Sequence, residues 1–391
     1  MLNKVKYNFD EQINRKNTNC AKYDGLKKYF GYEDLNPLWV ADMDFKTPAF
    51  INDAIIDAAK NSLYGYSIDS DEIYQSIINW QNTQHNWQIN KEDIYMINGV
   101  VPAYSACIEA FSEENDEVIV QTPIYPPLFK CVISNNRKVV VNELKKDENG
   151  YYTMDLEDLE KKITPKTKIL ALCSPHNPVG RVWSKDELEK LANICIKYNI
   201  IIVSDEIHSD ITFKKFTPLA SISKEIANQT ITLNSAGKTF NIAGLNSAYA
   251  ISKNQEILDK FKKIAQKREI QSINFFGYIA TKAAYDNGAL FVEDLKKYLL
   301  SNIEFTKNYF KKNNMKIDFH IPEATYLLWL DFSKYNFSHN EIKNILLTKS
   351  KIALNDGVSF GNNGNGYFRL NLALSQNALE IALSQLSKEF L

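Results

Sequence analysis

The chain has 391 residues, of which 45% are hydrophobic, which is enough for a sizeable core and, by length, for two domains. Its 46 basic and 47 acidic residues give a formal net charge of −1 with no long run of one sign, which argues against nucleic acid or an anionic membrane surface as a partner. The sequence has neither the apolar run of a signal peptide at its start nor an apolar stretch long enough to cross a bilayer, so we expect a cytoplasmic globular protein.

The five cysteines are odd in number and widely separated, at positions 20, 107, 131, 173 and 195. They form no CxxC pair, so we expect free, mostly buried thiols and no metal site. Free thiols are typical of a reducing compartment.

The first part of the chain combines polar turns with helix signals. Residues 1–45 are mixed and end in an apolar and acidic run, WVADMDF, at 39–45. Thr47 and Pro48 then mark the start of a helix expected over 49–62. The YGY triplet at 64–66 is typical of a turn, and its tyrosines suit either packing or function. An amphipathic helix is expected over 72–85.

From residue 93 onward, apolar strand-like runs alternate with helix-like runs. This alternation predicts an α/β protein whose mainly parallel sheet is covered by helices on both faces. One such helix is expected at 184–198, where Ser184 and Glu187 have the spacing of a capping box. The seven expected strands are 94–97, 117–121, 138–142, 168–173, 200–204, 230–234 and 247–251.

The last third of the chain has the pattern of a smaller α+β domain. Lysine-rich helices are expected over 253–283, long enough to bridge two lobes. Beyond them, helices alternate with strand-like runs at 326–332 and 367–372. We therefore expect an N-terminal segment, 1–45, packing with the small domain, a large ligand-binding domain over 46–285, and a small C-terminal domain over 286–391.

Ligands of open α/β sheets bind beyond the carboxyl ends of the strands, and several expected strands end in informative residues. Gly99, Val100 and Val101 open a helix whose free amides suit a phosphate, although a simple helix entry gives the same pattern. Prolines fix the path of Tyr125, whose ring suits a planar ligand or ordinary packing. Asn177 lies in a proline-rich turn, where it either faces a ligand or bonds its own backbone.

Charged residues follow the next two strands. A carboxylate after the very apolar run 200–203, Asp205, needs a cationic or donor partner. His208 faces the same site or is a satisfied core histidine. Lys238 lies between an apolar strand and a glycine-punctuated apolar segment, where burying an ammonium without a purpose is costly. It is therefore a candidate amine nucleophile, with an ordinary surface lysine as the alternative.

One cofactor requires all of these groups. Pyridoxal phosphate (PLP) needs a lysine for a Schiff base, an acid beside its ring nitrogen, an aromatic face, a donor to its phenolic oxygen and a phosphate cup. The matching residues, in that order, are Lys238, Asp205, Tyr125, Asn177, and the amides of Gly99, Val100 and Val101 with Ser235. Arg369, in a strand-like run, suits the carboxylate of an amino-acid substrate, with a structural ion pair as the alternative.

Seven segments in one order make essentially the whole chain resemble the fold-type I PLP enzymes, the aspartate aminotransferase superfamily. More narrowly, the chain is similar to the cystathionine β-lyase (C–S lyase) branch related to the maltose-regulon modulator. The segments are WVADMDF (39–45), YGY (64–66), GVVPA (99–103), TPIYPPLF (122–129), SPHNPVGRVW (174–183), SDEIHSDI (204–211) and KTFNIAGLNSAY (238–249).

The resemblance implies roles for matched positions. It implies a homodimer in which Tyr64 reaches the phosphate in the neighbouring subunit's site. It also implies that Arg369 holds the substrate carboxylate and that His208 lies near the phenolic oxygen of the cofactor. His208 and Asn246 are lyase-like, because aminotransferases commonly have tyrosine and arginine at these positions.

The implied reaction is β-elimination from a sulfur-bearing amino acid. Lys238 would remove the α proton, and L-cystathionine would give homocysteine, pyruvate and ammonia, a reaction of methionine biosynthesis and cysteine metabolism. The alternatives are an aminotransferase, which shares the whole cofactor site, and a regulatory or binding protein that retains the fold. Two departures from the family pattern are Gly237, where serine is usual, and Ala324, where glycine is usual.

Overall fold

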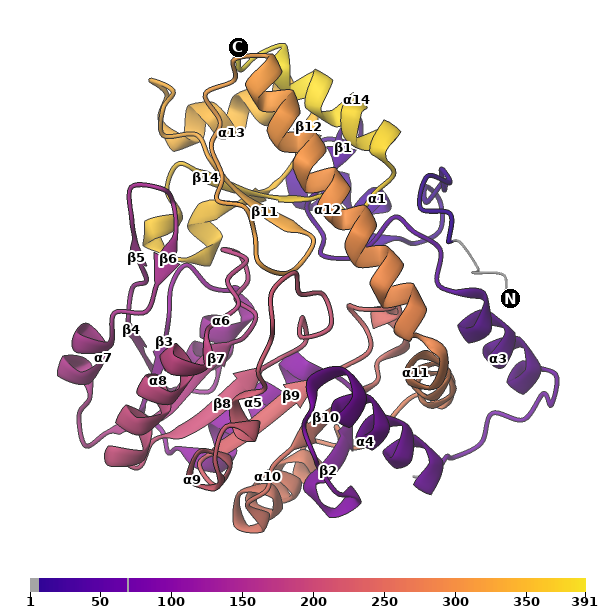
Figure 1. Ribbon diagram of the computed structural model, residues 1–391, viewed down its shortest axis with the longest axis vertical. Coiled ribbons are helices and arrows are strands. Elements are labelled where there is room, and N and C mark those ends of the chain that lie inside the picture. Colours follow the sequence, from indigo (N-terminus) through magenta and orange to yellow (C-terminus); the bar gives the residue numbers. More distant parts are fainter. Residues whose placement is uncertain (1–6, 69) are drawn as a thin grey trace.

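A seven-stranded sheet forms the centre of the computed structural model, which describes residues 7–68 and 70–391 (Figure 1). Residues 1–6 of the expected N-terminal segment lie outside this description. In spatial order the strands are β2 (Ile94–Ile97), β10 (Ala248–Ile251), β9 (Thr230–Asn234), β8 (Ile201–Asp205), β7 (Thr167–Cys173), β3 (Glu117–Val120) and β4 (Lys138–Val141). β10 runs antiparallel to the other six strands, which are parallel to one another. The expected mainly parallel α/β sheet is confirmed.

Helices cover both faces of this sheet because its central strands are apolar on both sides. On one side α10 packs against α5, and elsewhere α11 packs against α3 and α4. The capping box expected at α8 is present, since Ser184 Oγ accepts from the Glu187 amide and the Glu187 carboxylate accepts from the Ser184 amide. The helices are α3 (Ala49–Ala59), α4 (Asp71–His85), α5 (Val100–Phe111), α6 (Pro127–Ser134), α7 (Leu156–Lys162), α8 (Lys185–Lys197), α9 (Lys224–Ala227), α10 (Gln255–Lys267) and α11 (Phe275–Asn287).

The helix that links the central sheet to the C-terminal layer is α12 (Ala289–Lys312), and not the 253–283 region expected from sequence (Figure 1). That region forms α10 and α11, whose apolar faces pack against the helices beside the large sheet. The buried face of α12 instead continues into the C-terminal layer, where Asn302 Nδ2 donates to the carbonyls of Leu372 and Leu374, both at 2.9 Å.

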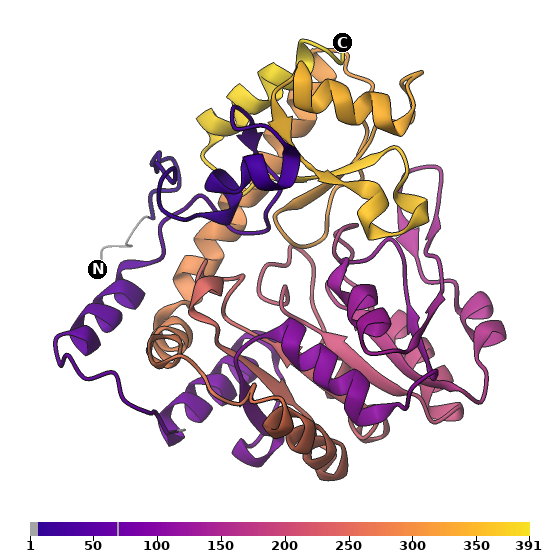
Figure 2. The ribbon, with the colours of Figure 1, turned by 180° about the vertical axis from the view of Figure 1, so that it is seen from behind.

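A second, three-stranded antiparallel sheet lies in the C-terminal part of the chain. It contains β11 (Leu327–Asp331), β14 (Tyr367–Asn371) and β13 (Asn355–Asp356), beside α13 (His339–Thr348) and α14 (Gln376–Ser387). The N-terminal segment contains α1 (Ala21–Asp24), α2 (Leu26–Phe30) and β1 (Asn36–Pro37). It lies against this part, because β1 pairs in parallel with β12 (Ile352–Ala353) (Figure 2). A small hairpin, β5 (Lys145–Lys146) with β6 (Tyr152–Thr153), extends from the large sheet.

The YGY segment is not the expected turn. Residues 63–68 form an irregular segment on the surface, in which Tyr64 is 61% and Tyr66 107% exposed. The Tyr64 hydroxyl donates to the carbonyl of Ala59 at 3.2 Å, and its ring approaches that of Phe276. Across residues 7–68 and 70–391, no helix combines the length and the apolar character needed to cross a membrane.

Candidate active site

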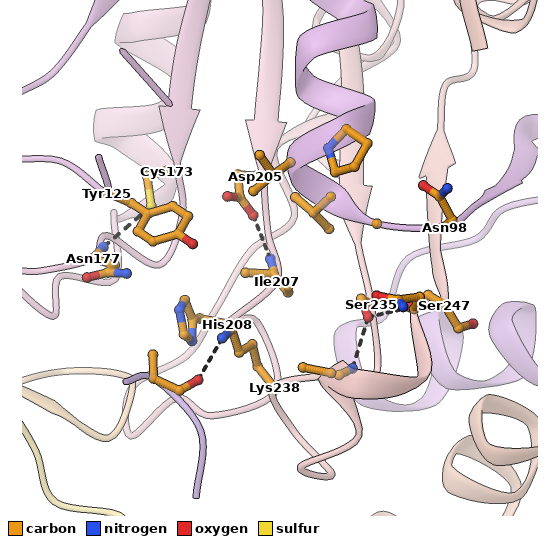
Figure 3. A pocket seen from close by; sticks show the side chains of 18 residues that line it. Asn98, Tyr125, Cys173, Asn177, Asp205, Ile207, His208, Ser235, Lys238 and Ser247 are labelled. Atoms are coloured by element: carbon orange, nitrogen blue, oxygen red, sulfur yellow. Dashed lines mark hydrogen bonds between the residues drawn. The ribbon is translucent and has the colours of Figure 1, made fainter. Parts of the chain in front are cut away.

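The carboxyl ends of the central strands and the start of α5 surround a cavity of about 250 Å³ (Figure 3). Tyr125 and Asn177 lie on one side of the close-up, Ser235 on the other, and Lys238 between them. The residues expected from sequence that line the cavity are Gly99, Val100, Val101, Tyr125, Asn177, Asp205, His208, Ser235 and Lys238. The fold therefore brings together groups that are up to 139 positions apart, from Gly99 to Lys238.

Lys238 follows β9 in a turn that places its ammonium inside the protein. Nζ donates to the carbonyl of Ala41 at 2.6 Å. Burial, with the charge of Arg369, lowers the pKa of the Lys238 amine to about 8, although Asp42 and Asp205 act in the opposite direction. A larger fraction of this amine than of an ordinary lysine is thus uncharged near neutral pH, as a nucleophile or base requires.

The segment around Ala41 was not recognised as part of the site from the sequence. It contributes a backbone carbonyl, which also accepts from the Tyr326 hydroxyl at 3.0 Å. A backbone contact leaves no side-chain signature, so the sequence holds no signal for it beyond the resemblance of residues 39–45.

Asp205 ends β8 as a buried carboxylate, 5% exposed. Its Oδ1 accepts from the Ile207 amide at 3.2 Å. Burial raises the pKa of this carboxyl to about 6, while the Ile207 amide and the charge of Lys238 lower it. Within residues 7–68 and 70–391, Asp205 forms no ion pair, so its charge is available to a cation in the cavity.

His208 is not a satisfied core histidine. It is 3% exposed, yet its Nδ1 has no hydrogen-bond partner within the described part of the chain. Burial, and then the charges of Lys238 and Arg369, lower the pKa of the imidazole to about 3. The ring is therefore neutral at physiological pH, and its Nδ1 retains an unused capacity for a hydrogen bond among the described residues.

Arg369 reaches the site from β14. Its guanidinium donates to Asn177 Oδ1 at 2.9 Å and to the Trp39 carbonyl at 3.0 Å, and burial lowers its pKa to about 10. Among the residues that the structure describes, no carboxylate lies within ion-pair distance, and Nε has no partner. The structural ion pair considered from the sequence is absent there. Arg369 does not itself line the cavity, but it lies behind the lining residue Asn177 as a buried cation without a counter-ion in the described residues.

Another end of the cavity is bordered by backbone amides that can donate hydrogen bonds. Gly99 precedes α5, and the amides of the first helical turn have no partner inside the helix. Asn98, which the sequence showed only as part of the glycine turn, also lines the cavity, and its buried Oδ1 has no hydrogen-bond partner among the described residues. This end suits an anionic group such as a phosphate.

Ser235 and Gly237 form a compact turn beside these amides. Ser235 Oγ donates to the Ser247 carbonyl at 2.6 Å and accepts from the Gly237 amide at 2.9 Å. Its hydroxyl must rotate to bind a phosphate. A Cβ at Gly237 would lie 3.1 Å from Ser235 Oγ and 3.2 Å from Ala243 Cα, so glycine at this position relieves a tight contact.

The groups around this cavity fit PLP. The partly deprotonated lysine matches its aldehyde, and the carboxylate, which has no cationic partner in the described residues, matches its ring nitrogen. The aromatic ring matches the ring face of the cofactor and the neutral imidazole its phenolic oxygen. The amides at the helix start match its phosphate.

Comparisons with known proteins agree with this fit. The family model "Aminotransferase class I and II" matches residues 37–386, and the chain belongs to that family of PLP-dependent proteins.

Two curated relatives and one solved structure are similar to this chain over almost its whole length. The cystathionine beta-lyase PatB of Bacillus subtilis is 36% identical over 382 residues, covering 97% of this chain and 98% of the relative. The protein MalY of Escherichia coli is 32% identical and covers 96% of both chains. A PLP-bound protein of Clostridium difficile 630, described as an aminotransferase, has a TM-score of 0.96 and 44% identity, with 97% of this chain and 99% of the other covered.

Proposed function

We propose that this protein is a PLP-dependent C–S lyase. It eliminates the thiol from L-cystathionine or a related thioether amino acid, which with water gives homocysteine or another thiol, pyruvate and ammonia. The observation that carries this proposal is the likeness to the cystathionine beta-lyase PatB over 97% of the chain. The lyase-like residues His208 and Asn246, both of which line the cavity, support it.

The residues around the cavity have separate tasks in binding. The amides of residues 99–101 hold the phosphate, and Asp205 keeps the ring nitrogen protonated. Tyr125 covers the ring face, while Asn177 and His208 approach the phenolic oxygen. When bound, the cofactor acts as an electron sink for the pair left on the substrate α carbon.

Arg369 and Lys238 act on the substrate itself. The Arg369 guanidinium, which lacks a protein counter-ion in the described residues, binds the α-carboxylate and so orients the Cα–H bond. The Lys238 amine, with its pKa of about 8, takes the α proton and holds it as an ammonium close to the β carbon. Loss of the thiolate from that carbon completes the elimination.

A single assay separates the lyase from an aminotransferase, which has the same cofactor site. We expect the holoenzyme to release pyruvate and free thiol from L-cystathionine with many turnovers per site and no 2-oxo acid added. Lactate dehydrogenase with NADH follows pyruvate, and a disulfide reagent follows thiol. Accumulation of aminated cofactor without pyruvate or thiol, reversed by a 2-oxo acid, would establish the aminotransferase instead.

We further propose that two copies of the chain form a dimer in which Tyr64 of each copy contributes to the site of the other. The exposed segment that carries this residue also presents Leu63, Tyr66 and Ile68, which are 78%, 107% and 87% exposed. Large apolar side chains exposed in one run are typical of a contact with another protein surface. In such a dimer Tyr64 would reach the phosphate in the site of the second copy.

Mixing two inactive variants tests this arrangement. In a hybrid of Lys238→Ala and Tyr64→Ala subunits, one site carries both changes and the other carries neither if Tyr64 serves the partner. We expect the mixture, after dissociation and reassociation, to exceed the mean activity of the separate variants several-fold. If Tyr64 acts within its own subunit, every site is defective and no recovery occurs.

A further inference from the structure

A buried carboxylate behind the cavity, Asp210, joins three parts of the protein. Its Oδ1 accepts from Trp80 Nε1 at 2.9 Å and contacts His85 Nε2 at 2.7 Å, both from α4. Its Oδ2 accepts from Thr239 Oγ1 at 2.7 Å, in the turn after β9. Asp210 itself belongs to the loop after β8, so one side chain connects a helix and two loops.

The charge of Asp210 is maintained although its side chain is only 4% exposed. Burial alone would raise the pKa of this carboxyl, but the hydrogen bonds from His85, Thr239 and Trp80, with the charge of His85, hold it below its ordinary value. A buried charge with several donors seldom stabilises a fold more than apolar residues of the same volume would. What its directional bonds do supply is a defined geometry.

The two loops joined by Asp210 are those that carry functional groups of the site. Asp210 comes two residues after His208, and Thr239 directly follows Lys238. A neighbouring bond, from Asn234 Nδ2 to Ser209 Oγ at 3.0 Å, joins the same loop to the end of β9. Neither Asp210 nor Thr239 lines the cavity as far as the structure describes it. Their influence on the site must pass through the backbone.

We propose that Asp210 is a positioning residue that locks the Lys238 turn to the His208 loop through Thr239. The inference rests on the proposed function, in which the Lys238 amine must meet both the cofactor and the substrate α proton. A shift of this amine by a fraction of an ångström weakens proton transfer without weakening substrate binding, because the Arg369 contacts come from another part of the fold.

Three variants of the holoenzyme test whether the Asp210–Thr239 hydrogen bond holds the Lys238 turn to the His208 loop. Thr239→Val removes the hydroxyl but retains the shape, Thr239→Ser restores the hydroxyl, and Trp80→Phe removes a different donor to the same carboxylate. For Thr239→Val we expect kcat to fall about tenfold with KM changed less than about twofold. We also expect the pH midpoint of the visible absorption of the bound cofactor to move by about half a unit.

The comparison among the variants separates positioning from stability. Thr239→Ser should return kcat and the absorption midpoint to the values of the unmodified protein, and Trp80→Phe should lower the melting temperature while leaving both unchanged. Equal changes in Thr239→Val and Trp80→Phe, in proportion to lost stability, would overturn the proposal. If Thr239→Val does not fold, Asp210→Asn is measured in the same way, with the same expectation and the same disproof.

The absorption measurement needs no substrate, so it is independent of the reaction. If the unmodified protein releases no pyruvate from thioether amino acids, the proposed lyase function fails. A shifted absorption midpoint in Thr239→Val still supports the lock between the two loops, and an unshifted one refutes it whatever the substrate proves to be.

Discussion

Lys238→Ala is expected to lower pyruvate release from L-cystathionine by about 10⁴-fold or more. The variant loses both the amine that bonds covalently to the cofactor and the base that takes the α proton. Steady-state pyruvate production measures the loss of the base, and the visible absorption of the reconstituted protein measures the loss of the covalent bond, because its long-wavelength band depends on the lysine linkage.

A surface lysine outside the site provides the matched control. Lys297 is exposed and paired with Asp294 at 3.1 Å, so Lys297→Ala should retain full activity. Residual activity of Lys238→Ala within tenfold of the unmodified enzyme would show that another group is the base. A cellular effect of the protein that persists in Lys238→Ala would indicate the regulatory role considered as an alternative.

Asp205→Asn should act in opposite directions on activity and on the stability of the cofactor-free protein. We expect activity to fall roughly a hundredfold or more, since loss of one partner of a buried charge pair costs about 3 kcal/mol. In the cofactor-free protein the same change removes a buried charge that has no cationic partner in the described residues. The variant should therefore be more stable than the unmodified protein by about 3 kcal/mol at neutral pH.

The pH dependence of this gain follows from the raised pKa of Asp205, about 6 in the folded protein. A carboxyl whose pKa is raised binds its proton more tightly when folded, so the unfavourable contribution is absent below the unfolded pKa of about 4 and complete above about 6. Urea unfolding of the cofactor-free proteins at pH 4 and pH 7.5 measures it. An equal stability difference at both pH values would contradict this explanation.

Much of the site was predictable because its side chains follow strands whose apolar runs are unmistakable. Seven such runs predict the seven strands of the central sheet, and the rule that ligands bind at their carboxyl ends predicts that Tyr125, Asn177, Asp205 and Lys238 lie together, as they do around the cavity. The sequence left open which hydrogen-bond and ion-pair partners these side chains have. An arginine in a strand has the same sequence pattern whether or not a carboxylate pairs with it, and only the structure shows that Arg369 has no such carboxylate among the described residues.

Other features could not be predicted because they depend on contacts between distant segments. Residues 253–283 and α12 both have the periodicity of a helix, so periodicity does not tell which of them links the two sheets. That depends on which part of the protein packs against the apolar face of each helix. The YGY segment has turn-like residues but an irregular, exposed path. The Ala41 carbonyl that receives Lys238 is a main-chain group, which every residue possesses.

The sequence by itself determined the α/β class, the chemical kinds of group at the strand ends, and the family, because periodicity and side-chain chemistry are local properties. The tertiary structure alone decided the pKa values of Lys238, Asp205 and His208, the lack of a counter-ion for Arg369 among residues 7–68 and 70–391, and the hydrogen bonds of Asp210. Each of these depends on burial and on charges contributed by residues far away in the chain, and neither can be read from the neighbours of a residue in sequence.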